Sequence, residues 1–516
     1  MENSFAIVPD VKKITSNSSV FSVSSQTKVF ADNSSSLPAA ILLAHYIQNI
    51  TTLALPIREG ESVTPQDILL STENSENVLD QNGFTDETYT LSIDDSGCHL
   101  SALYPMGLFR GVQVLRQLLS THSTNLPGCH IEDSPRFRWR GVHLDVSRHF
   151  FDEETVCRFI DAAAYHRLNV VHLHLTDDQG WRMPIDAFPR LTSVASKREC
   201  TVLGHQHTRP RTYNDQPHEG FYTKEQIQNI VEFAAQRGVH ILPEIDMPGH
   251  MQAAITAYPE WGCTQEKPGV RCSWGISQHI LNPNESTMKA METILDEVME
   301  LFPWTFIHIG GDEAHKYQWD ESREVQERMA ELGATSEEEL QSRFIARMAN
   351  HVASRGRKAI GWDEILEGGL AENASVMSWR GEEGGIEAAK KGHDVVMAPM
   401  QSTYFDHYQG SPETEPLGIG GLTTLEKAYM YNPLPQSLSP EESRFVMGTQ
   451  AQLWTEYIPN SNHLDYMTYP RLCAFAEAAW RESEKVDYPA FLERMQIHKK
   501  RMEELGIQFA PIPTTT

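Results

Sequence analysis

Hydrophobic and polar residues alternate with two different periods in the larger, C-terminal part of this chain. From residue 140 onward, short apolar runs that fit buried strands are followed by segments whose apolar residues recur three and four positions apart, as on one face of a helix. Strands are predicted at residues 141–146, 170–176, 239–245, 305–309, 358–362, 375–379, 394–398 and 445–453, and helices at 153–167, 224–237, 287–301 and 488–505. Eight strands alternating with helices over about 315 residues predict a (β/α)8 TIM barrel, and we expect the last of these helices to close it.

The first 133 residues show a different pattern, in which short strands accompany two helices. Strands are predicted at residues 29–31, 67–70 and 87–93, and helices at 37–50 and 106–119. Asp133-Ser134-Pro135 then interrupts the pattern. We therefore predict an α/β protein in which a small α+β domain at residues 1–133 precedes a barrel domain at residues 134–516. A doubly wound sheet is the rival fold, but no Gly-rich phosphate-binding turn follows any predicted strand.

Composition and charge narrow the class of partner. With 516 residues, 40% of them apolar and 22% charged, the chain has the make-up of a globular protein large enough for two domains. Its formal net charge of -27 argues against nucleic acids and anionic membranes, which require a basic surface. No apolar run approaches the ~20 residues of a membrane span. We therefore expect a neutral or small partner, and the oligomeric state is left open.

Two features bear on the cellular compartment. Residues 1–10 show no basic region followed by an apolar core, so we expect no signal peptide, and hence a cytoplasmic protein, or a periplasmic or secreted one if a signal has been trimmed. The seven cysteines lie at positions 98, 129, 157, 200, 263, 272 and 473 without a Cys-x-x-Cys pair, which argues against a structural zinc site. Cys263 and Cys272 are spaced to bridge a loop, but the odd total favours free buried thiols.

Two adjacent carboxylates follow the fourth predicted barrel strand. The apolar run that ends at Ile309 leads into Gly310 and Gly311 and then into Asp312 and Glu313. Burying a carboxylate without a partner is costly, and the glycines allow a close approach of backbone or ligand. Acid pairs at strand ends recur in barrels that cleave glycosides. The alternative is a helix N-terminus with acids in its first turn.

Carboxylates, an arginine, a histidine and aromatic residues follow the other predicted strands, at the end of the barrel where active sites form. Carboxylate and arginine groups make charge-assisted hydrogen bonds to hydroxyls, and aromatic faces cover the apolar faces of a sugar ring. This inventory favours a sugar ligand. The residues are Arg148, Asp177, His250, Trp362, Trp379, Tyr404, Asp406, Trp454 and Glu456.

A metal-dependent hydrolase is the main enzymatic alternative. His172 and His174 point to one face of the second predicted strand, and Asp177 follows them. Both histidines precede the end of that strand, however, so core or supporting roles are favoured. We expect no metal and no cofactor.

Several segments also resemble a known family. Residues 140–150, 172–182, 243–250, 308–315 and 453–456 match, in order, the motifs of the family-20 glycoside hydrolases, and the resemblance extends over the whole chain, including the small domain ahead of the barrel. The principal activity of that family is β-N-acetylhexosaminidase. The resemblance therefore implies an exo-acting enzyme that releases terminal β-linked GlcNAc or GalNAc from glycans or chitooligosaccharides.

The resemblance assigns catalytic roles to five positions. Glu313 would be the general acid and then the base that activates water. Asp312 would hold the N–H of the substrate's acetamido group, and Tyr404 would hydrogen-bond its carbonyl oxygen. Asp177 and His250 would lie behind Glu313 and tune its pKa. The remaining implied residues bind the sugar: Trp362, Trp379 and Trp454 around the acetamido methyl group, and Arg148, Asp406 and Glu456 at the ring hydroxyls.

The implied mechanism is retaining and substrate-assisted, with the acetamido oxygen attacking C1 to form an oxazolinium ion. An acid that works at neutral pH needs a raised pKa, and we expect the aromatic walls and Asp312 to raise that of Glu313. Two alternatives stay open, a lacto-N-biosidase of the same family and a non-catalytic sugar-binding relative. One departure from the family is that many bacterial relatives carry a second cysteine where this chain has residues 281–283, so the bridge to Cys263 is either missing or made by Cys272.

Overall fold

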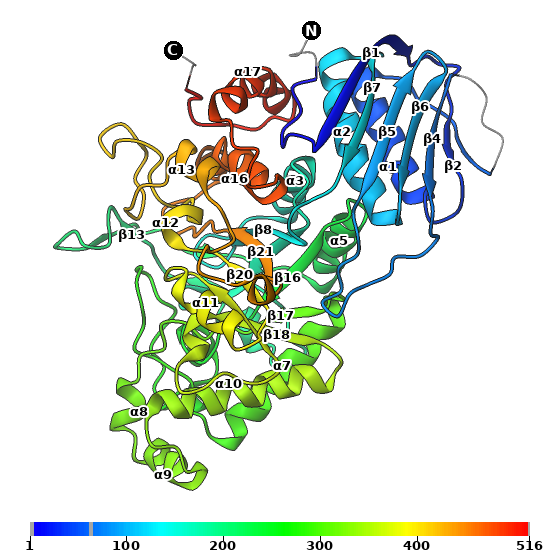
Figure 1. Cartoon of the computed structure of the whole chain (residues 1–516). Coiled ribbons are helices and arrows are strands. Elements are labelled where there is room, and N and C mark those ends of the chain that lie inside the picture. Colours follow the sequence, from blue (N-terminus) through cyan, green and yellow to red (C-terminus); the bar gives the residue numbers. More distant parts are fainter. Residues whose placement is uncertain (1–4, 61–65, 514–516) are drawn as a thin grey trace.

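Eight parallel strands form a closed barrel in the computed structural model, which describes residues 5–60 and 66–513 (Figure 1). All eight predicted barrel strands are confirmed, and with them the TIM-barrel fold class. The last strand pairs with the first in parallel and closes the cylinder. The strands are β8 (Trp139–Asp145), β9 (Val170–His174), β16 (His240–Glu244), β17 (Phe306–His308), β18 (Lys358–Trp362), β19 (Ala374–Ser378), β20 (Val395–Met397) and β21 (Val446–Ala451).

The helices outside the barrel begin with clear sequence signals. The Asp152 side chain accepts a hydrogen bond from the Thr155 backbone N–H at the start of α3, and Thr223 and Gln226 form a capping box at the start of α5. Such caps satisfy N–H groups that a helix start leaves unpaired. The predicted helices are confirmed as α3 (Glu153–Tyr165), α5 (Lys224–Ala235), α7 (Glu285–Leu301) and α17 (Tyr488–Glu504); α10 (Glu337–Ser354), α11 (Glu383–Lys390), α13 (Leu425–Met430) and α16 (Arg471–Trp480) complete the outer layer.

The prediction that the last helix closes the barrel is wrong. It is α16 that contacts both β21 and β8, whereas α17 packs on α13 and on α2 (Pro105–His122) of the N-terminal domain. The composition of the two helices explains the difference. Every residue of α16 is buried, as a helix between a barrel and its surroundings requires, whereas α17 is amphipathic and keeps one face exposed.

The N-terminal domain is a seven-stranded sheet with α1 (Leu37–Thr51) and α2 against it (Figure 1). Its strands in spatial order are β1 (Lys13–Ser22), β7 (Asn125–Asp133), β5 (Tyr89–Asp94), β6 (Gly97–Ala102), β4 (Asp67–Thr72), β2 (Val29–Ala31) and β3 (Ile57–Glu59). Apolar residues of β5 are buried at every second position, as a sheet covered on one face requires. The sequence pattern missed β1, β3, β6 and β7, because these strands carry polar residues on their open side or are only three residues long.

Buried ion pairs join the two domains. Glu87 of the N-terminal domain accepts hydrogen bonds from Arg110 and from Arg140 of β8. Asp133, the last residue of β7, accepts them from Arg167 and from the indole of Trp480 in α16. All of these side chains are nearly fully buried, so the carboxylates are paired as buried charges require. These contacts fix the sheet against the N-terminal ends of the barrel strands, on the side opposite to the strand ends that carry the predicted site.

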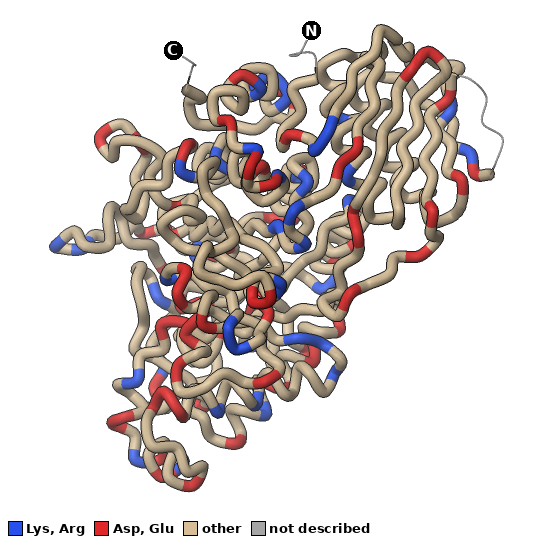
Figure 2. The backbone as a smooth tube through the Cα atoms, viewed as in Figure 1, with Lys and Arg blue, Asp and Glu red and all other residues tan. Residues whose placement is uncertain are grey.

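Charged residues of both signs are distributed over the whole described chain. Figure 2 shows lysines and arginines interspersed with acidic residues along the described backbone, without a basic stripe. Within the described residues, no helix has both the length and the apolar character needed to span a bilayer. Residues 1–4, part of the segment without a signal-peptide pattern, lie outside the described residues, and the compartment stays a prediction.

Candidate active site

The acid pair follows β17 in a backbone conformation that requires glycine at position 310. Gly310 has φ +65°, and a β-carbon there would lie 1.7 Å from Asp246 Oδ1. The Gly311 N–H donates to the same oxygen at 3.1 Å. Glu313 itself has φ +46°, an uncommon backbone conformation for a residue with a side chain, and such conformations concentrate at functional sites. Because α8 (Tyr317–Glu321) begins only later, the alternative of acids in the first turn of a helix is wrong.

The two carboxylates have different surroundings although they are neighbours. The Asp312 side chain is 11% exposed, whereas that of Glu313 is 33% exposed. Both face the imidazole of His250, whose Nε2 lies 3.6 Å from Asp312 Oδ2 and 3.5 Å from Glu313 Oε2. Asp312 Oδ1 has no hydrogen-bond partner within the described part of the chain. The buried acid thus keeps one oxygen free, and the other acid is open to an incoming ligand.

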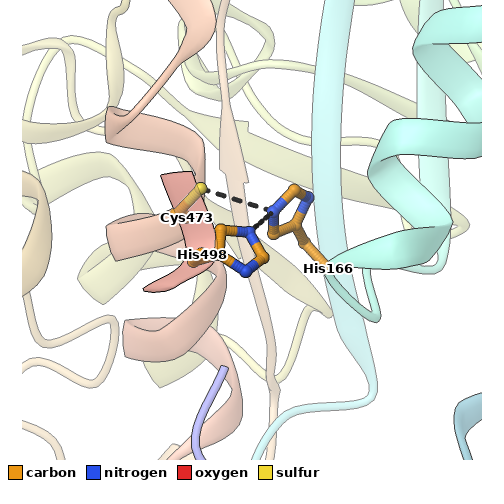
Figure 3. A group of neighbouring side chains, drawn as sticks. All are labelled: His166, Cys473 and His498. Carbon is orange, nitrogen blue, oxygen red and sulfur yellow. Dashed lines mark hydrogen bonds between the residues drawn. The ribbon is translucent and has the colours of Figure 1, made fainter. Parts of the chain in front are cut away.

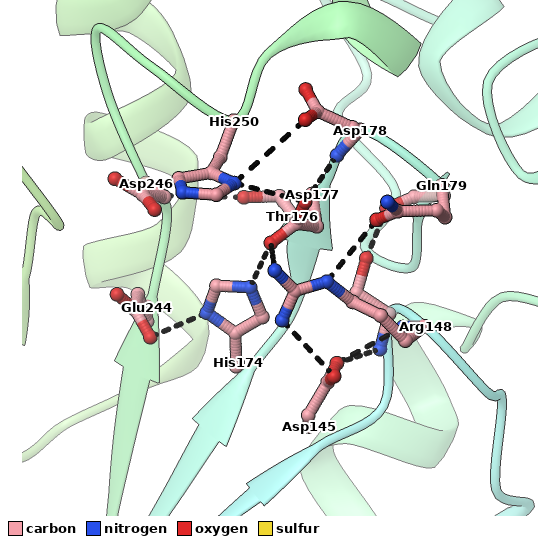
Figure 4. Close-up of polar contacts among 12 residues, drawn as sticks. Asp145, Arg148, His174, Thr176, Asp177, Asp178, Gln179, Glu244, Asp246 and His250 are labelled. Carbon is pink, nitrogen blue, oxygen red and sulfur yellow. Dashed lines mark hydrogen bonds and ion pairs between the residues drawn. The ribbon is translucent and has the colours of Figure 1, made fainter. Parts of the chain in front are cut away.

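A chain of ionised groups supports His250 from behind (Figure 4). His250 Nδ1 lies 3.1 Å from Asp177 Oδ1, on the short strand β10 (Thr176–Asp177) that follows β9. The other oxygen of Asp177 binds His174 Nε2 at 2.7 Å and Arg148 Nη2 at 2.8 Å. His174 Nδ1 in turn lies 2.6 Å from Glu244 at the end of β16. The end of β9 is therefore tied to the neighbouring strand and to the acid pair.

The electrostatics of this chain correct one expectation. Burial raises the pKa of Glu313, but the hydrogen bond and the positive charge of His250 outweigh it, so the Glu313 pKa lies below its usual value rather than above it. Burial and the nearby Asp246 carboxyl hold the pKa of Asp312 well above the usual range. Burial lowers the pKa of His250, but the Asp177 carboxylate outweighs this effect and holds the His250 pKa well above its usual value. These opposite shifts favour Asp312 over Glu313 as the carrier of a proton in the free protein.

A second set of charged side chains lies at the ends of β8, β20 and β21. The Arg148 guanidinium pairs with Asp145 Oδ2 at 3.2 Å and lies 5.0 Å from the Trp454 ring centre. Asp406 is 5% exposed, and its Oδ1 has no hydrogen-bond partner among the described residues. Burial and the Glu456 carboxyl raise the pKa of Asp406 well above its usual range. The free oxygen of Asp406 can therefore accept a hydrogen bond from a ligand.

Aromatic side chains complete the walls of a cavity of about 610 Å³. Trp379 stacks on Tyr404 with ring centres 6.2 Å apart, and Trp362 lies 5.8 Å from Trp454. The structure brings ten of the eleven residues predicted for the site to this cavity. The eleventh, Asp177, lies behind His250. The ten are Arg148, His250, Asp312, Glu313, Trp362, Trp379, Tyr404, Asp406, Trp454 and Glu456.

The histidines of β9 lie beneath the cavity and not on its wall. His172 Nε2 and His174 Nδ1 lie 3.1 Å and 2.6 Å from Glu244 Oε2, in the closed interior of the barrel. The other Glu244 oxygen accepts a hydrogen bond from the Trp362 indole at 2.8 Å. These contacts agree with the supporting role that their position in β9 favours. Glu244 is a buried centre that holds an aromatic wall of the cavity.

Sequence reasoning missed other residues of the site. Glu364 accepts a hydrogen bond from the Trp379 indole at 2.9 Å, and burial together with the Asp312 charge raises the Glu364 pKa to about 8. The signal was its position, two residues after Trp362 at the end of a predicted strand. Gln206, His207 and Ile276 reach the cavity from long loops, where the sequence pattern gives no signal.

Cys263 and Cys272, whose pairing the sequence left open, do not form a bridge. All seven cysteines are free, and each lies within the described residues. The Cys263 thiol donates to the Ile280 carbonyl at 3.6 Å, whereas the Cys272 thiol donates to the Val270 carbonyl at 3.7 Å. The expectation of free thiols is therefore confirmed.

A closed parallel barrel with an acid pair, an arginine and aromatic walls at the C-terminal ends of its strands is an arrangement of the glycoside hydrolase class. Comparison with protein families agrees. The model of the glycosyl hydrolase family 20 catalytic domain matches residues 137–483, and the model of domain 2 of that family matches residues 4–134. This chain belongs to glycosyl hydrolase family 20.

Individual relatives give the extent of the similarity. A β-hexosaminidase of Porphyromonas gingivalis is 39% identical over 98% of this chain, and one of Vibrio furnissii is 37% identical over 77% of it. The chain spans 64% and 66% of their lengths, just under two thirds. Among solved structures, an exo β-N-acetylglucosaminidase of Vibrio harveyi in complex with N-acetylglucosamine is 30% identical with a TM-score of 0.86, covering 99% of this chain and 79% of that one.

Proposed function

We propose that this protein is an exo-acting, retaining β-N-acetylhexosaminidase that hydrolyses terminal, non-reducing β-linked GlcNAc or GalNAc by substrate-assisted catalysis. The observation that carries the proposal is the geometry of the acid pair: Asp312 and Glu313 leave one short segment and face the same imidazole at 3.6 Å and 3.5 Å. The relatives that are named β-hexosaminidases support the same activity.

The geometry of the pair does not suit a protein nucleophile. A retaining enzyme with its own nucleophile places the two carboxyl groups on opposite sides of the scissile bond, about 5 Å apart. Asp312 shares the His250 side of the cavity with Glu313, and its carboxyl is mostly covered. In the proposed reaction the acetamido oxygen of the substrate instead forms the bond to C1 while Glu313 protonates the leaving oxygen. Water then attacks C1, gives its proton back to Glu313 and reopens the oxazolinium ring.

Glu313 has to carry a proton before that step. Without a ligand a proton is favoured on Asp312, whose pKa is raised by burial and by Asp246, while His250 lowers the pKa of Glu313. When the acetamido N–H of a substrate approaches Asp312, it favours the ionised form of that carboxyl. The protonated His250 lies between the two acids and offers a route for the proton. Binding and acid activation are thus coupled.

The remaining residues orient the acetamido group and the ring. Tyr404 stacks on Trp379 beside Asp312, where its hydroxyl can donate to the acetamido carbonyl. Asp406 has an unpartnered oxygen for a ring hydroxyl, and Arg148 and Glu456 line the same part of the cavity. Because charged groups close the cavity there, a terminal sugar fits better than the inner sugar of a longer chain. This feature disfavours a lacto-N-biosidase, which has to hold a disaccharide.

Proton NMR of the first-formed product tests the proposal. Digestion of 4-nitrophenyl β-GlcNAc should release the β-anomer first, whereas the α-anomer would contradict retention. Digestion of lacto-N-tetraose should leave no lacto-N-biose disaccharide, since its release would favour the biosidase. Turnover itself dismisses a sugar-binding role without catalysis. Full activity after treatment with EDTA is expected, and a loss that is restored by added metal would favour the metal-dependent alternative.

A further inference from the structure

A second cluster of chemically reactive side chains lies outside the cavity (Figure 3). It consists of His166, which follows the last residue of α3, Cys473 in the first turn of α16, and His498 in α17. We call these three residues the His–Cys cluster. Each is 0% exposed, and none of them lines the active-site cavity. The proposed reaction uses none of them.

The donor atoms of the His–Cys cluster converge at the distances of a metal site. His166 Nε2 lies 2.9 Å from His498 Nε2 and 3.3 Å from Cys473 Sγ. All three donor atoms lie within 4.8 Å of one another. In a tetrahedral zinc site, with bonds of about 2.0–2.1 Å to nitrogen and about 2.3 Å to sulfur, donor atoms are roughly 3.3–3.6 Å apart. Small side-chain movements would therefore accommodate an ion.

The surroundings of the His–Cys cluster favour a ligand role. His166 Nδ1 donates to the Ala162 carbonyl at 2.7 Å, so its Nε2 carries the lone pair, and metal-binding histidines are oriented by just such a bond. Met502, one turn after His498, places Sδ 3.9 Å from Cys473 Sγ. The buried Tyr469 hydroxyl has no partner in the described part of the chain, and its ring lies 5.6 Å from that of His166.

We propose that the His–Cys cluster binds one thiophilic transition-metal ion, with Zn²⁺ as the best match, through His166 Nε2, His498 Nε2 and Cys473 Sγ. Imidazole and thiolate donors without a carboxylate select such ions over Mg²⁺ or Ca²⁺. Met502 Sδ is the nearest further donor. Binding releases the thiol proton of Cys473 to solvent and moves the His498 proton from Nε2 to Nδ1. The hydrogen bond that Arg501 Nη1 donates to His498 Nδ1 at 3.5 Å is then given up.

The ion would join three helices, and among them α17 contacts α2 of the N-terminal domain. The role of the ion would therefore be structural: it would hold α17 against α3 and α16. The sequence gives no motif for this site, because His166 lies more than 300 residues from both other donors along the chain.

Metal titration of the full chain tests the proposal. Protein stripped with a chelator should take up one equivalent of Zn²⁺ at this site, and Co²⁺ in its place should give a thiolate-to-cobalt charge-transfer band. The midpoint of thermal unfolding should rise by about 3 °C when free Zn²⁺ exceeds the dissociation constant about 100-fold. Cys473→Ala should abolish the band, and His498→Asn should weaken binding at least about tenfold. Cys129→Ala, a buried cysteine of the N-terminal sheet, is the matched control and should bind like the native chain.

The same experiment can overturn the proposal. Absence of the thiolate band in the native chain does so, and so does uptake that Cys473→Ala leaves unchanged, because the ion then lies elsewhere. If the two variants fail to fold, X-ray absorption of the zinc-loaded native chain decides between sulfur with imidazole and oxygen ligands alone. Hydrolytic activity is not the readout, so the outcome does not depend on the proposed function.

Discussion

The two ends of the barrel are built from the same strands but from opposite kinds of residue. Where the strands begin, Trp139, Trp304 and Phe306 pack with ring centres 5.1–5.4 Å apart and are almost fully buried. Where the strands end, ionised side chains replace them. In barrels of this class the first end serves stability and the second serves catalysis. The change from packing to polar side chains therefore takes place over strands of three to seven residues.

The two ends also differ in which buried polar groups of the described chain lack a partner: at the strand starts they are N–H donors such as Trp304 Nε1, and at the strand ends they are carboxylate oxygens. Asp312, Asp246 and Asp406 at the strand ends each keep a carboxylate oxygen without a hydrogen-bond partner within the described residues. His250 and Glu313 have positive φ angles at the same end. Unpaired oxygens and strained backbone reduce stability, and they persist where a ligand uses them. The cavity is thus prepared for a polar ligand at the expense of its own stability.

The largest effect is expected at the end of the barrel that holds the cavity. Glu313→Gln should lower kcat by about 10²–10⁴-fold, because general acid catalysis contributes that much. The unfolding temperature should stay unchanged, since the side chain is one-third exposed. Steady-state rates and thermal unfolding check this, with Glu260→Gln at the surface as the control. A rate within threefold of the native enzyme would contradict the assignment.

A substitution where the strands begin should lower stability and leave catalysis nearly unchanged. Phe306→Ala removes a fully buried ring and should lower the free energy of unfolding by about 3–5 kcal/mol. In protein that remains folded, kcat should stay within a few-fold of native. Urea unfolding and rates on the same preparation measure both quantities. A kcat loss as large as that of Glu313→Gln would show that the two ends are not separable.

Asp312→Asn tests how the acid pair shares its proton. The loss of charge beside the developing oxazolinium should cost about 10²–10³-fold in kcat. In the native enzyme, kcat/KM should fall as pH drops through the lowered pKa of Glu313, which adds a second proton, and as pH rises through the raised pKa of Asp312. The variant holds its proton on Glu313 alone, so the alkaline limb should move to lower pH. If the alkaline limb of the pH–rate profile stays at the same pH in the variant, the two carboxyl groups do not share a proton.

A matched pair of tryptophan substitutions gives the smallest expected effect. Trp362→Phe removes the hydrogen bond to Glu244, worth about 1 kcal/mol, and should lower kcat/KM roughly fivefold. Trp139→Phe removes a comparable bond to Gln450 at the other end of the barrel and should lower only stability. Kinetics and denaturation of both variants make the comparison. Equal kinetic effects would contradict it.

Local periodicity was enough to predict the barrel but not every neighbour. The eight strands are short apolar runs, and their C-terminal ends meet by the logic of the fold, so ten of the predicted residues come to one cavity. The pKa of Glu313 was predicted in the wrong direction, because the charge that lowers it belongs to His250, 63 positions away in the sequence and brought close only by folding. The His–Cys cluster was missed for the same reason. Edge strands such as β1 were missed because their exposed residues hide the alternation.

The most direct test compares initial rates on 4-nitrophenyl β-GlcNAc and on the matching β-glucoside. Substrate assistance predicts fast release from the first and almost none from the second, because the glucoside has no acetamido oxygen to attack C1. Comparable rates on the two substrates would mean that the protein supplies its own nucleophile, and the proposed mechanism would be wrong.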